Sequence, residues 1–316
     1  MKKTLYTLIA LLFTQFAWAQ NINKIISREY VDHLIKTLSS DEMEGRAIYT
    51  AGIDRAATFI ESEFKSIGLI PLEGETGFRQ TFEREGKPLF NVAGMIPGKS
   101  KTKELVVFSG HYDHLGIIKG DEQDSIANGA DDDASGITAM IALAKYYKAL
   151  NNNERTLIFV AFTAEESGGF GSRHFSKKLN PDDVVAMFNI EMIGKESKFG
   201  KNAAFITGFD KSDFGKILQK NLKGTEFTFH PDPYIRQNLF YRSDNATLAA
   251  LGVPAHTIST DQIDIDKFYH TVKDEYSTLD TENILATIKA IAKSAISIIK
   301  GTDTPTRIPR LVEAHD

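Results

Sequence analysis

The sequence Thr-Leu-Ile-Phe-Val-Ala-Phe at residues 156–162 is followed closely by the acid pair Glu165 and Glu166. After its first residue this run is continuously apolar, which is the pattern of a strand buried on both faces rather than one that alternates between core and solvent. The acid pair comes directly after the strand, where the chain leaves the sheet. This segment therefore predicts an interior strand with carboxylates at its carboxyl end.

Further apolar strands alternate with amphipathic helices along the rest of the chain. The expected strands cover residues 105–108, 184–190, 203–207 and 253–258, and the expected helices cover residues 135–150 and 281–299. Buried strands that alternate with helices are typical of parallel sheets with both faces covered. The sequence thus predicts an α/β fold, with a mainly parallel central sheet flanked by helices on both faces in three layers.

The region before these strands has helical rather than strand periodicity. Apolar residues recur at helical spacing over residues 28–38 and 51–67, and Gly68 follows the second pattern as a stop signal. We therefore expect an N-terminal helical extension over residues 20–85, packed on a catalytic domain at residues 86–302. Residues 303–316 are expected to form a C-terminal tail.

The first residues have the features of a secretory signal peptide. Met1-Lys2-Lys3 is basic, residues 5–18 are mostly apolar, and Ala17-Trp18-Ala19 is a small-x-small cleavage pattern. The apolar run is too short and too interrupted for a stable membrane span, and no second apolar stretch is long enough. The prediction is a signal peptide at residues 1–19 and a periplasmic or secreted protein, with an uncleaved anchor as the alternative.

Composition narrows the possible function classes. The 316 residues are 42% hydrophobic and 25% charged, which is ordinary for a globular chain with a large core. The net charge is -5 and no basic run occurs, so nucleic acid is not expected as a partner. The chain contains no cysteine, which excludes disulfides and attachment of a lipid through cysteine.

Five side chains, spread over half of the chain, are candidate metal ligands. They are His111, Asp131, Glu166, Glu191 and His270. Most of them follow an expected strand, and the carboxyl ends of parallel strands are where open α/β sheets place their sites. Two histidines and three carboxylates, one of them shared, suit a pair of zinc ions, which can polarise an amide carbonyl and activate a water.

The segment Asp131-Asp132-Asp133 lies between small residues before an expected helix. Acids near a helix N-terminus are favoured by the helix dipole, so a capped helix start is the alternative explanation. Close packing around a cation explains the adjacent small residues better, and we take Asp131 as the bridging ligand.

The segments around His111 and around Glu165 each combine a candidate metal ligand with a second functional group. Asp113 follows His111 by two residues, and its carboxylate can hold the ring of His111 through the nitrogen that does not bind metal. His114 is a further pocket candidate or an unrelated neighbour. Of the acid pair, we assign Glu165 as the general base, with a pKa raised in a partly dry pocket, and Glu166 as a ligand. The alternatives are that His111 is a plain loop residue and that Glu165 and Glu166 lie in a solvated turn.

Four of these segments, in order, resemble motifs of the M28 family of zinc peptidases, which includes bacterial leucyl aminopeptidases. They are Gly-His-Tyr-Asp-His-Leu-Gly (110–116), Asn-Gly-Ala-Asp-Asp-Asp-Ala-Ser-Gly (128–136), Thr-Ala-Glu-Glu (163–166) and Tyr-His-Thr (269–271). The region from Leu38 to Leu69, with Glu44-Gly45-Arg46, also looks like the helical lead-in of many bacterial members. The resemblance extends from about residue 38 to the final helix and implies the fold of zinc-dependent exopeptidases.

The resemblance also implies roles for the ligands. His111 and Glu191 would hold one zinc, Glu166 and His270 the other, and Asp131 would bridge the two. Glu165 would be the general base. In the family, the peptide bond that corresponds here to Asp131–Asp132 is often cis.

Two positions depart from the family pattern. Glu191 stands where the family commonly has Asp, so the carboxylate is kept but is one methylene longer. The Ser-Asp-His often found near the substrate site is Ser243-Asp244-Asn245 here. Tyr241, just upstream, is expected to donate a hydrogen bond to the oxyanion, as a nearby Tyr does in some relatives; Tyr234 and Tyr269 compete for this role.

The expected function is therefore a zinc-dependent exopeptidase with two zinc ions per chain, most simply an aminopeptidase that acts on peptides with free N-termini. The alternatives are a glutaminyl cyclase with one zinc, a carboxypeptidase, and a non-catalytic binding domain of the same fold. The sequence leaves the oligomeric state and the side-chain preference open.

Overall fold

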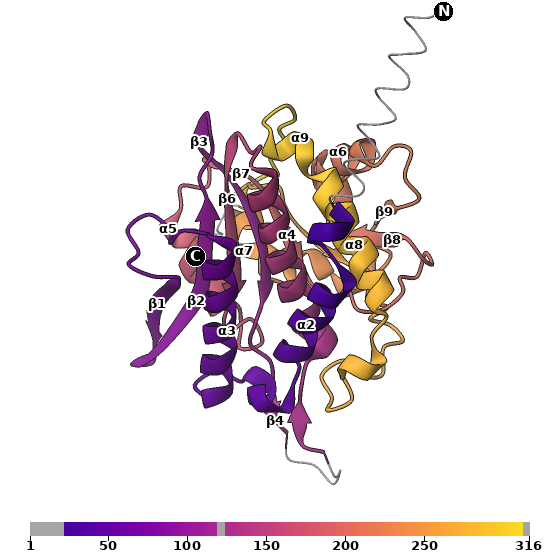
Figure 1. Cartoon of the computed structure of the whole chain (residues 1–316). Coiled ribbons are helices and arrows are strands. Elements are labelled where there is room, and N and C mark those ends of the chain that lie inside the picture. Colours follow the sequence, from indigo (N-terminus) through magenta and orange to yellow (C-terminus); the bar gives the residue numbers. More distant parts are fainter. Residues whose placement is uncertain (1–21, 119–123, 312–316) are drawn as a thin grey trace, which may run out of the picture.

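The computed structural model describes residues 22–118 and 124–311 and shows an eight-stranded sheet between layers of helices (Figure 1). In sheet order the strands are β1 (Arg79–Arg84), β2 (Lys87–Ile96), β6 (Arg155–Phe162), β3 (Lys101–His111), β7 (Val184–Ile190), β10 (Ala255–Ser259), β8 (Ala203–Ile206) and β9 (Thr228–Pro231). A separate two-stranded sheet joins β4 (Gly116–Ile117) to β5 (Ile126–Ala127).

The centre of the large sheet is parallel. Strands β6, β3, β7 and β10 run in the same direction, whereas β1, β2 and β8 join through antiparallel pairs. All eight residues of β6 and all seven of β7 are buried, as their continuous apolar sequences predict. The predicted mainly parallel sheet with helices around it is confirmed, and the carboxyl ends of four central strands meet at one edge.

One face of the sheet is covered by a group of long helices. The group comprises α2 (Arg28–Leu38), α3 (Ala51–Ile67), α4 (Gly136–Leu150) and α8 (Thr281–Ser294), with α6 (Phe214–Asn221) and the short α9 (Ile296–Ile299) beside α8 (Figure 1). Helix α4 lies directly on β3, β6 and β7 and is itself covered by α2, α3 and α8. Because α4 is enclosed on both sides, eleven of its fifteen residues are buried.

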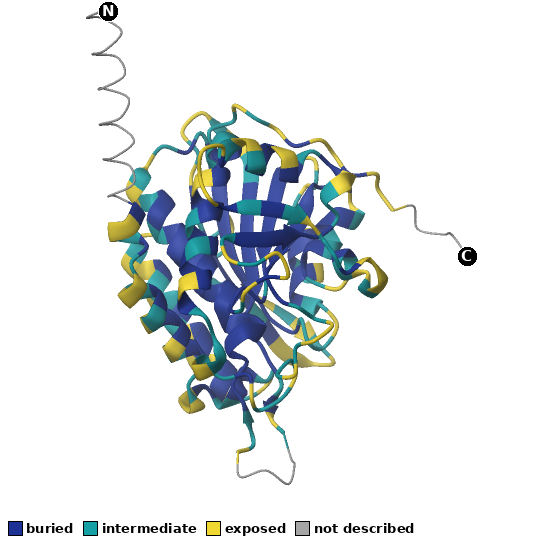
Figure 2. Cartoon of the chain, turned by 90° about the vertical axis from the view of Figure 1, so that its right-hand side faces the viewer, coloured by how far each residue is buried: buried dark blue, intermediate teal, exposed yellow. Residues whose placement is uncertain are grey.

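The opposite face carries the shorter helices α5 (Phe170–Lys178) and α7 (Asn245–Ala250). Their buried side chains form a second core with Val107, Val160 and Met187 from the centre of the sheet. Figure 2 shows the result: the central strands are buried, while exposed residues lie mainly on the outer sides of the helices and in the loops. Both faces of the sheet are therefore dry at its centre, and the buried polar groups of the site lie at the ends of the central strands.

The predicted N-terminal helices are found at their expected positions. Ser27 and Thr50 cap them by accepting hydrogen bonds from the N–H groups of Tyr30 and Ile53, and Gly68 ends α3 in the left-handed conformation with φ 82°. However, residues 79–84, expected within the helical extension, form β1 and pair with β2. The partition into extension, catalytic domain and tail stays a prediction.

Two predictions concern the ends of the chain, which the structure describes only in part. The signal peptide at residues 1–19 lies outside them. Of the predicted tail, residues 303–311 are described, and Ile308 is buried with its N–H donating to the carbonyl of Gly252. Within the two described ranges, no helix has the length and apolar character needed to cross a bilayer.

A buried histidine in β10 makes the stability of this fold sensitive to pH. His256 is fully buried; its Nδ1 lies 2.8 Å from the carbonyl oxygen of Thr207, and its Nε2 lies 2.7 Å from Oγ of Ser212. A carbonyl can only accept, so Nδ1 carries the proton and Nε2 accepts from the hydroxyl. Burial lowers the pKa of His256 to about 4. The neutral ring is therefore the form that the core accommodates.

We predict that acid destabilises the protein through His256. The pKa is depressed in the folded state, so the stability is present above the unfolded pKa of about 6.5 and is lost as the pH falls toward 4. Between pH 7 and pH 5 the loss amounts to about 2 kcal/mol. Urea unfolding of metal-free protein at both pH values measures it, with His256→Gln as the non-titrating control. An equal fall in both proteins would contradict the prediction.

Candidate metal centre

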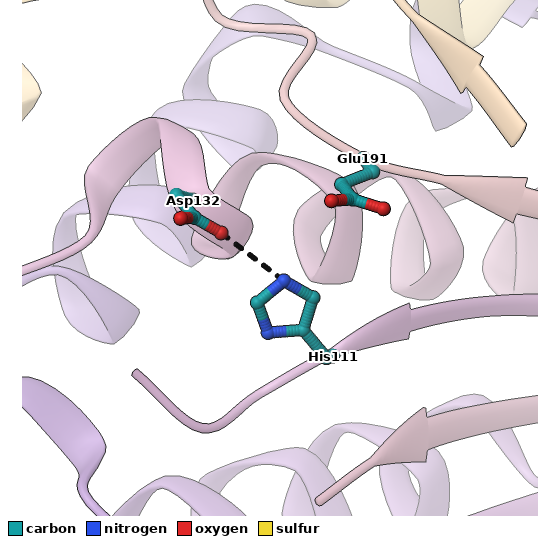
Figure 3. A group of neighbouring side chains, drawn as sticks. All are labelled: His111, Asp132 and Glu191. Atoms are coloured by element: carbon teal, nitrogen blue, oxygen red, sulfur yellow. Dashed lines mark ion pairs between the residues drawn. The ribbon is translucent and has the colours of Figure 1, made fainter. Parts of the chain in front are cut away.

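The carboxyl ends of the central strands bring the candidate ligands to one place. His111 is the last residue of β3, Glu165 and Glu166 follow β6, and Glu191 follows β7. The turn before α4 adds Asp132, and a loop before α8 adds His270 from far along the sequence. Figure 3 shows His111, Asp132 and Glu191 on three separate segments, with His111 directed toward Asp132. The parallel centre of the sheet is what gathers these groups.

Asp132 lies between two histidines. Its Oδ1 is 3.1 Å from Nε2 of His111, and its Oδ2 is 3.2 Å from Nε2 of His270. Glu166 forms a group with Asp132 and His270, called here the second group, because its Oε2 is 3.1 Å from the same nitrogen of His270. One carboxylate thus faces a different imidazole with each oxygen, which is the arrangement required of a ligand shared by two metal ions.

The structure corrects the expected bridging residue, which was Asp131. The carboxylate of Asp131 points elsewhere: its Oδ1 accepts the N–H of Gly194 at 2.7 Å, and its Oδ2 lies 3.5 Å from Nζ of Lys195. The backbone N–H groups of both Asp131 and Asp132 donate to the carboxylate of Asp274. With the backbone fixed in this way, only the middle acid of the three faces the histidines.

The third acid of the turn has a structural role. One oxygen of Asp133 accepts the N–H of His111 at 3.1 Å, and the other accepts the N–H groups of Gly136 and Met192. Asp133 therefore joins the ends of β3 and β7 to the start of α4. The cis peptide bond of this turn lies between Asp132 and Asp133, one residue later than expected.

Asp113 contacts His111, but differently from the expectation. Nδ1 of His111 lies 3.0 Å from the backbone carbonyl oxygen of Asp113 and 3.8 Å from its carboxylate. The carboxylate instead accepts the N–H groups of Glu165 at 3.1 Å and of Glu166 at 3.3 Å. Asp113 thus orients the imidazole with its main chain and holds the acid pair with its side chain.

Glu191 forms the first group of candidate ligands together with His111 and Asp132. One atom each from His111, Asp132 and Glu191 lie within 4.8 Å of one another, and Figure 3 shows the Asp132 and Glu191 carboxylates on either side of the end of the His111 ring. Its backbone N–H donates to the carbonyl of Ile258 in β10, and Asn189 Nδ2 lies 3.5 Å from Oε2. The longer side chain of Glu therefore still delivers a carboxylate to the group.

A buried arginine that the sequence analysis gave no catalytic role fastens the site to the N-terminal region. The guanidinium of Arg46 donates to the carbonyl oxygens of Tyr112, Leu38, Asn128 and Gly129. The carbonyls of Tyr112, Asn128 and Gly129 belong to the loops that follow β3 and precede the Asp132 turn, and that of Leu38 ends α2, so one side chain ties these segments together. The only sequence signal for it was the Glu44-Gly45-Arg46 segment; Asp274 had none beyond its position near His270.

A cavity adjoins both groups of ligands. It is lined by the ligands Asp132, Glu166, Glu191 and His270, by Glu165, and by Met192, Phe205, Thr207, Leu239, Arg242, Ser243, Thr257, Ser259, Asp261, Ile263 and Tyr269. Tyr241 is not among the lining residues; its ring packs edge-on against Phe240. The oxyanion donor expected at Tyr241 is therefore not placed at the cavity, whereas its competitor Tyr269 is.

The centre holds more negative than positive charge. Hydrogen bonds that His270 donates to the carboxylates of Asp132 and Glu166 raise its pKa to about 10, so the ring holds its proton strongly when no metal competes for the nitrogen. Burial raises the pKa of Glu165 well above its usual value, and the neighbouring Glu191 raises it further. Such a cluster of acids favours cations.

The donor set fits zinc. Imidazole nitrogens and carboxylate oxygens are its ordinary ligands in catalytic sites. Donor atoms at zinc-ligand distances in a tetrahedron lie about 3.3 Å apart, and Nε2 of His270 lies 3.2 Å from Oδ2 of Asp132 and 3.1 Å from Oε2 of Glu166. The donor types and these two spacings therefore suit the metal.

Several known proteins are similar to this chain in sequence or in structure. Leucine aminopeptidase 1 of Ajellomyces capsulatus is 29% identical over 213 residues, which cover 62% of this chain and 52% of the relative. BSAP, a zinc aminopeptidase from Bacillus subtilis, has a similar structure with a TM-score of 0.70 at 13% identity, over 87% of this chain and 95% of that one. Porphyromonas gingivalis glutaminyl cyclase gives 0.67 at 15% identity, over 86% and 99%.

The solved structures share the fold with this chain, and the chain spans between a quarter and about half the length of the first curated relatives that it matches. The sequence profile of Peptidase family M28 matches residues 91–295, from β2 to the end of α8. This range contains all five candidate ligands that the structure brings together. The chain belongs to peptidase family M28.

Proposed function

We propose that this protein is a zinc-dependent aminopeptidase that removes residues from the free N-termini of peptides. The observation that carries the proposal is the position of Asp132 between His111 and His270, with Glu165 on the wall of the same cavity. Relatives named leucine aminopeptidase and zinc aminopeptidase support the choice of substrate class.

Two zinc ions per chain agree with the ligand geometry. His111 and Glu191 would hold one ion, Glu166 and His270 the other, and Asp132 would be shared. When bound, the metal pair supplies Lewis acidity, which polarises the scissile carbonyl and lowers the pKa of a water. Glu191 takes the place of the Asp common in the family and still reaches this group.

Glu165 is the proposed general base. Its neighbour Glu166 faces His114 and His270, whereas Glu165 has neither histidine as an ion-pair partner among the described residues. Burial raises its pKa, which brings a carboxylate closer to the range in which it both takes and returns a proton near neutral pH. Glu165 would take a proton from the attacking water and return it to the leaving amine.

Tyr269 is the proposed hydrogen-bond donor to the oxyanion, in place of Tyr241. It lines the cavity and its ring stacks on His270 with 3.8 Å between centroids. Burial raises its pKa, so the phenol keeps its proton at neutral pH. The proposed setting is periplasmic or secreted, as the signal-peptide pattern at residues 1–19 predicts.

Activity on matched substrates tests the proposed reaction. We predict chelator-sensitive release of p-nitroaniline from aminoacyl p-nitroanilides and no release from their N-acetylated counterparts. Cyclisation of an N-terminal glutaminyl peptide, without hydrolysis, would support the glutaminyl cyclase alternative, which shares the fold. Cleavage of the acetylated substrates would contradict the requirement for a free N-terminus.

If Glu165 is the general base, its replacement should lower the rate of turnover but leave metal binding unchanged. Glu165→Gln removes the proton acceptor but keeps the size of the side chain, so kcat should fall by about 10²–10⁴-fold. Zinc content should stay at the wild-type level, because Glu165 is not a ligand in the proposal. Single-turnover kinetics together with zinc analysis of the same sample measure both. Near-normal turnover would show that another group is the base.

Asp132 and Asp131 form a matched pair that tests the corrected bridge. Asp132→Asn should lower zinc affinity at both positions and abolish turnover, because it removes the shared charge. Asp131→Asn keeps an oxygen for the N–H of Gly194 and should retain wild-type zinc content. Competition with a chromophoric zinc chelator gives both affinities. Loss of zinc in Asp131→Asn alone would restore the original assignment.

A further inference from the structure

Glu166 has a histidine at each of its two carboxylate oxygens. Nδ1 of His114 lies 2.9 Å from Oε1, and Nε2 of His270 lies 3.1 Å from Oε2. Both histidines also approach Oδ2 of Asp132, at 3.8 Å for His114 and 3.2 Å for His270. Either imidazole is therefore a candidate ligand for the second metal, whereas the sequence predicts only His270 there.

We propose that His114 is a positioning residue, which holds Glu166 by donating its Nδ1 proton to Oε1 and so presents Oε2 to the metal. This inference rests on the proposed metal centre and assigns His114 a place outside the ligand set. The ring does not have to change its protonation state, because both the cation and the Nδ1–H tautomer donate from that nitrogen.

The distances separate the two histidines. Nε2 of His270 lies about equally far from its two oxygen neighbours, at 3.1 and 3.2 Å, close to the spacing of about 3.3 Å between donors on one zinc. Nδ1 of His114 is far closer to Glu166 than to Asp132, at 2.9 against 3.8 Å. A short contact to one oxygen is the geometry of a charge-assisted hydrogen bond.

The His114 ring is fixed from the protein side. Its side chain has no exposed surface, and its backbone N–H donates to the carbonyl oxygen of Arg46. Gly129 covers the ring so closely that a Cβ at this position would lie 2.5 Å from Cδ2 of His114. The backbone of Gly129 also has φ 54°, so no other residue fits here without strain. The ring has little room to swing toward a metal.

The other ring nitrogen supports this assignment. Nε2 of His114 is buried and has no hydrogen-bond partner among the described residues. Packing and the single bond from Nδ1 to Glu166 therefore hold the side chain. A flexible glutamate gains a preferred orientation from such a partner, and loss of a hydrogen bond to a ligand commonly costs about 10–100-fold in metal affinity.

Three substitutions test the role of Nδ1. The amide nitrogen of His114→Asn falls near the position of Nδ1, that of His114→Gln falls nearer to Nε2, and His114→Leu has no donor. Wild-type protein and each variant are stripped of metal and titrated with Co²⁺, with visible absorption and calorimetry as readouts. Circular dichroism of the metal-free proteins serves as the folding control, and His270→Ala serves as the ligand-loss reference.

We expect His114→Leu and His114→Gln to weaken the second Co²⁺ site by about 10–100-fold, while the first site and the absorption spectrum of the loaded protein are unchanged. His114→Asn should restore the affinity to near the wild-type value. If all three variants, Asn included, lose the second ion as His270→Ala does, His114 is a ligand and the proposal is wrong. If none changes the affinity, the hydrogen bond has no role and the proposal is also wrong.

These outcomes are independent of the reaction. Wild-type protein that binds two metal ions but hydrolyses no peptide would overturn the proposed aminopeptidase function and leave the test of His114 valid. Wild-type protein that binds only one ion would overturn the two-metal centre, and His114 would then be tested on whichever site His270→Ala abolishes.

Discussion

The buried carboxylates at one edge of the sheet are the constraint on which the rest of the structure depends. Asp113, Asp131, Asp132 and Asp133 are almost completely buried, and Glu165, Glu166 and Glu191 lie beside them. Burying unpaired charge is unfavourable by several kcal/mol per ion. Each acid therefore needs a donor or a cation, and the surrounding loops are organised to supply them.

The chain meets this demand in three ways. Backbone N–H groups serve the acids that shape the loops: Asp133 and Asp274 hold the turn before α4, and Asp113 holds the acid pair. Lys195 neutralises Asp131 on the side away from the ligands. Asp132 is the acid that remains, with a histidine on each side, and metal ions are the partners that suit its carboxylate best. The same acids thus separate into those that build the site and those that bind in it.

The sequence predicted the sheet well, because continuous apolar runs have few alternatives to interior strands. Residues 28–38, 51–67 and 184–190 were predicted with the bounds that the structure shows. It did not predict β1 and β9, at the two outer edges of the sheet, because their residues are only partly buried and lack an apolar run. It also indicated the segments whose candidate ligands the structure brings together, since most of these segments follow a strand or precede a helix.

Which acid of Asp131-Asp132-Asp133 faces the histidines was decided only by the tertiary structure. Adjacent residues of one type look alike in sequence, and the choice depends on Asp274, Gly194 and Lys195, which lie more than sixty positions away. The pairing of His114 with Glu166 is likewise a contact between loops that the sheet brings together. The sequence by itself determined the fold and the kinds of candidate ligand, because the apolar pattern and the donor chemistry are properties of the local sequence. Orientation is not local, and it needed the packed loops.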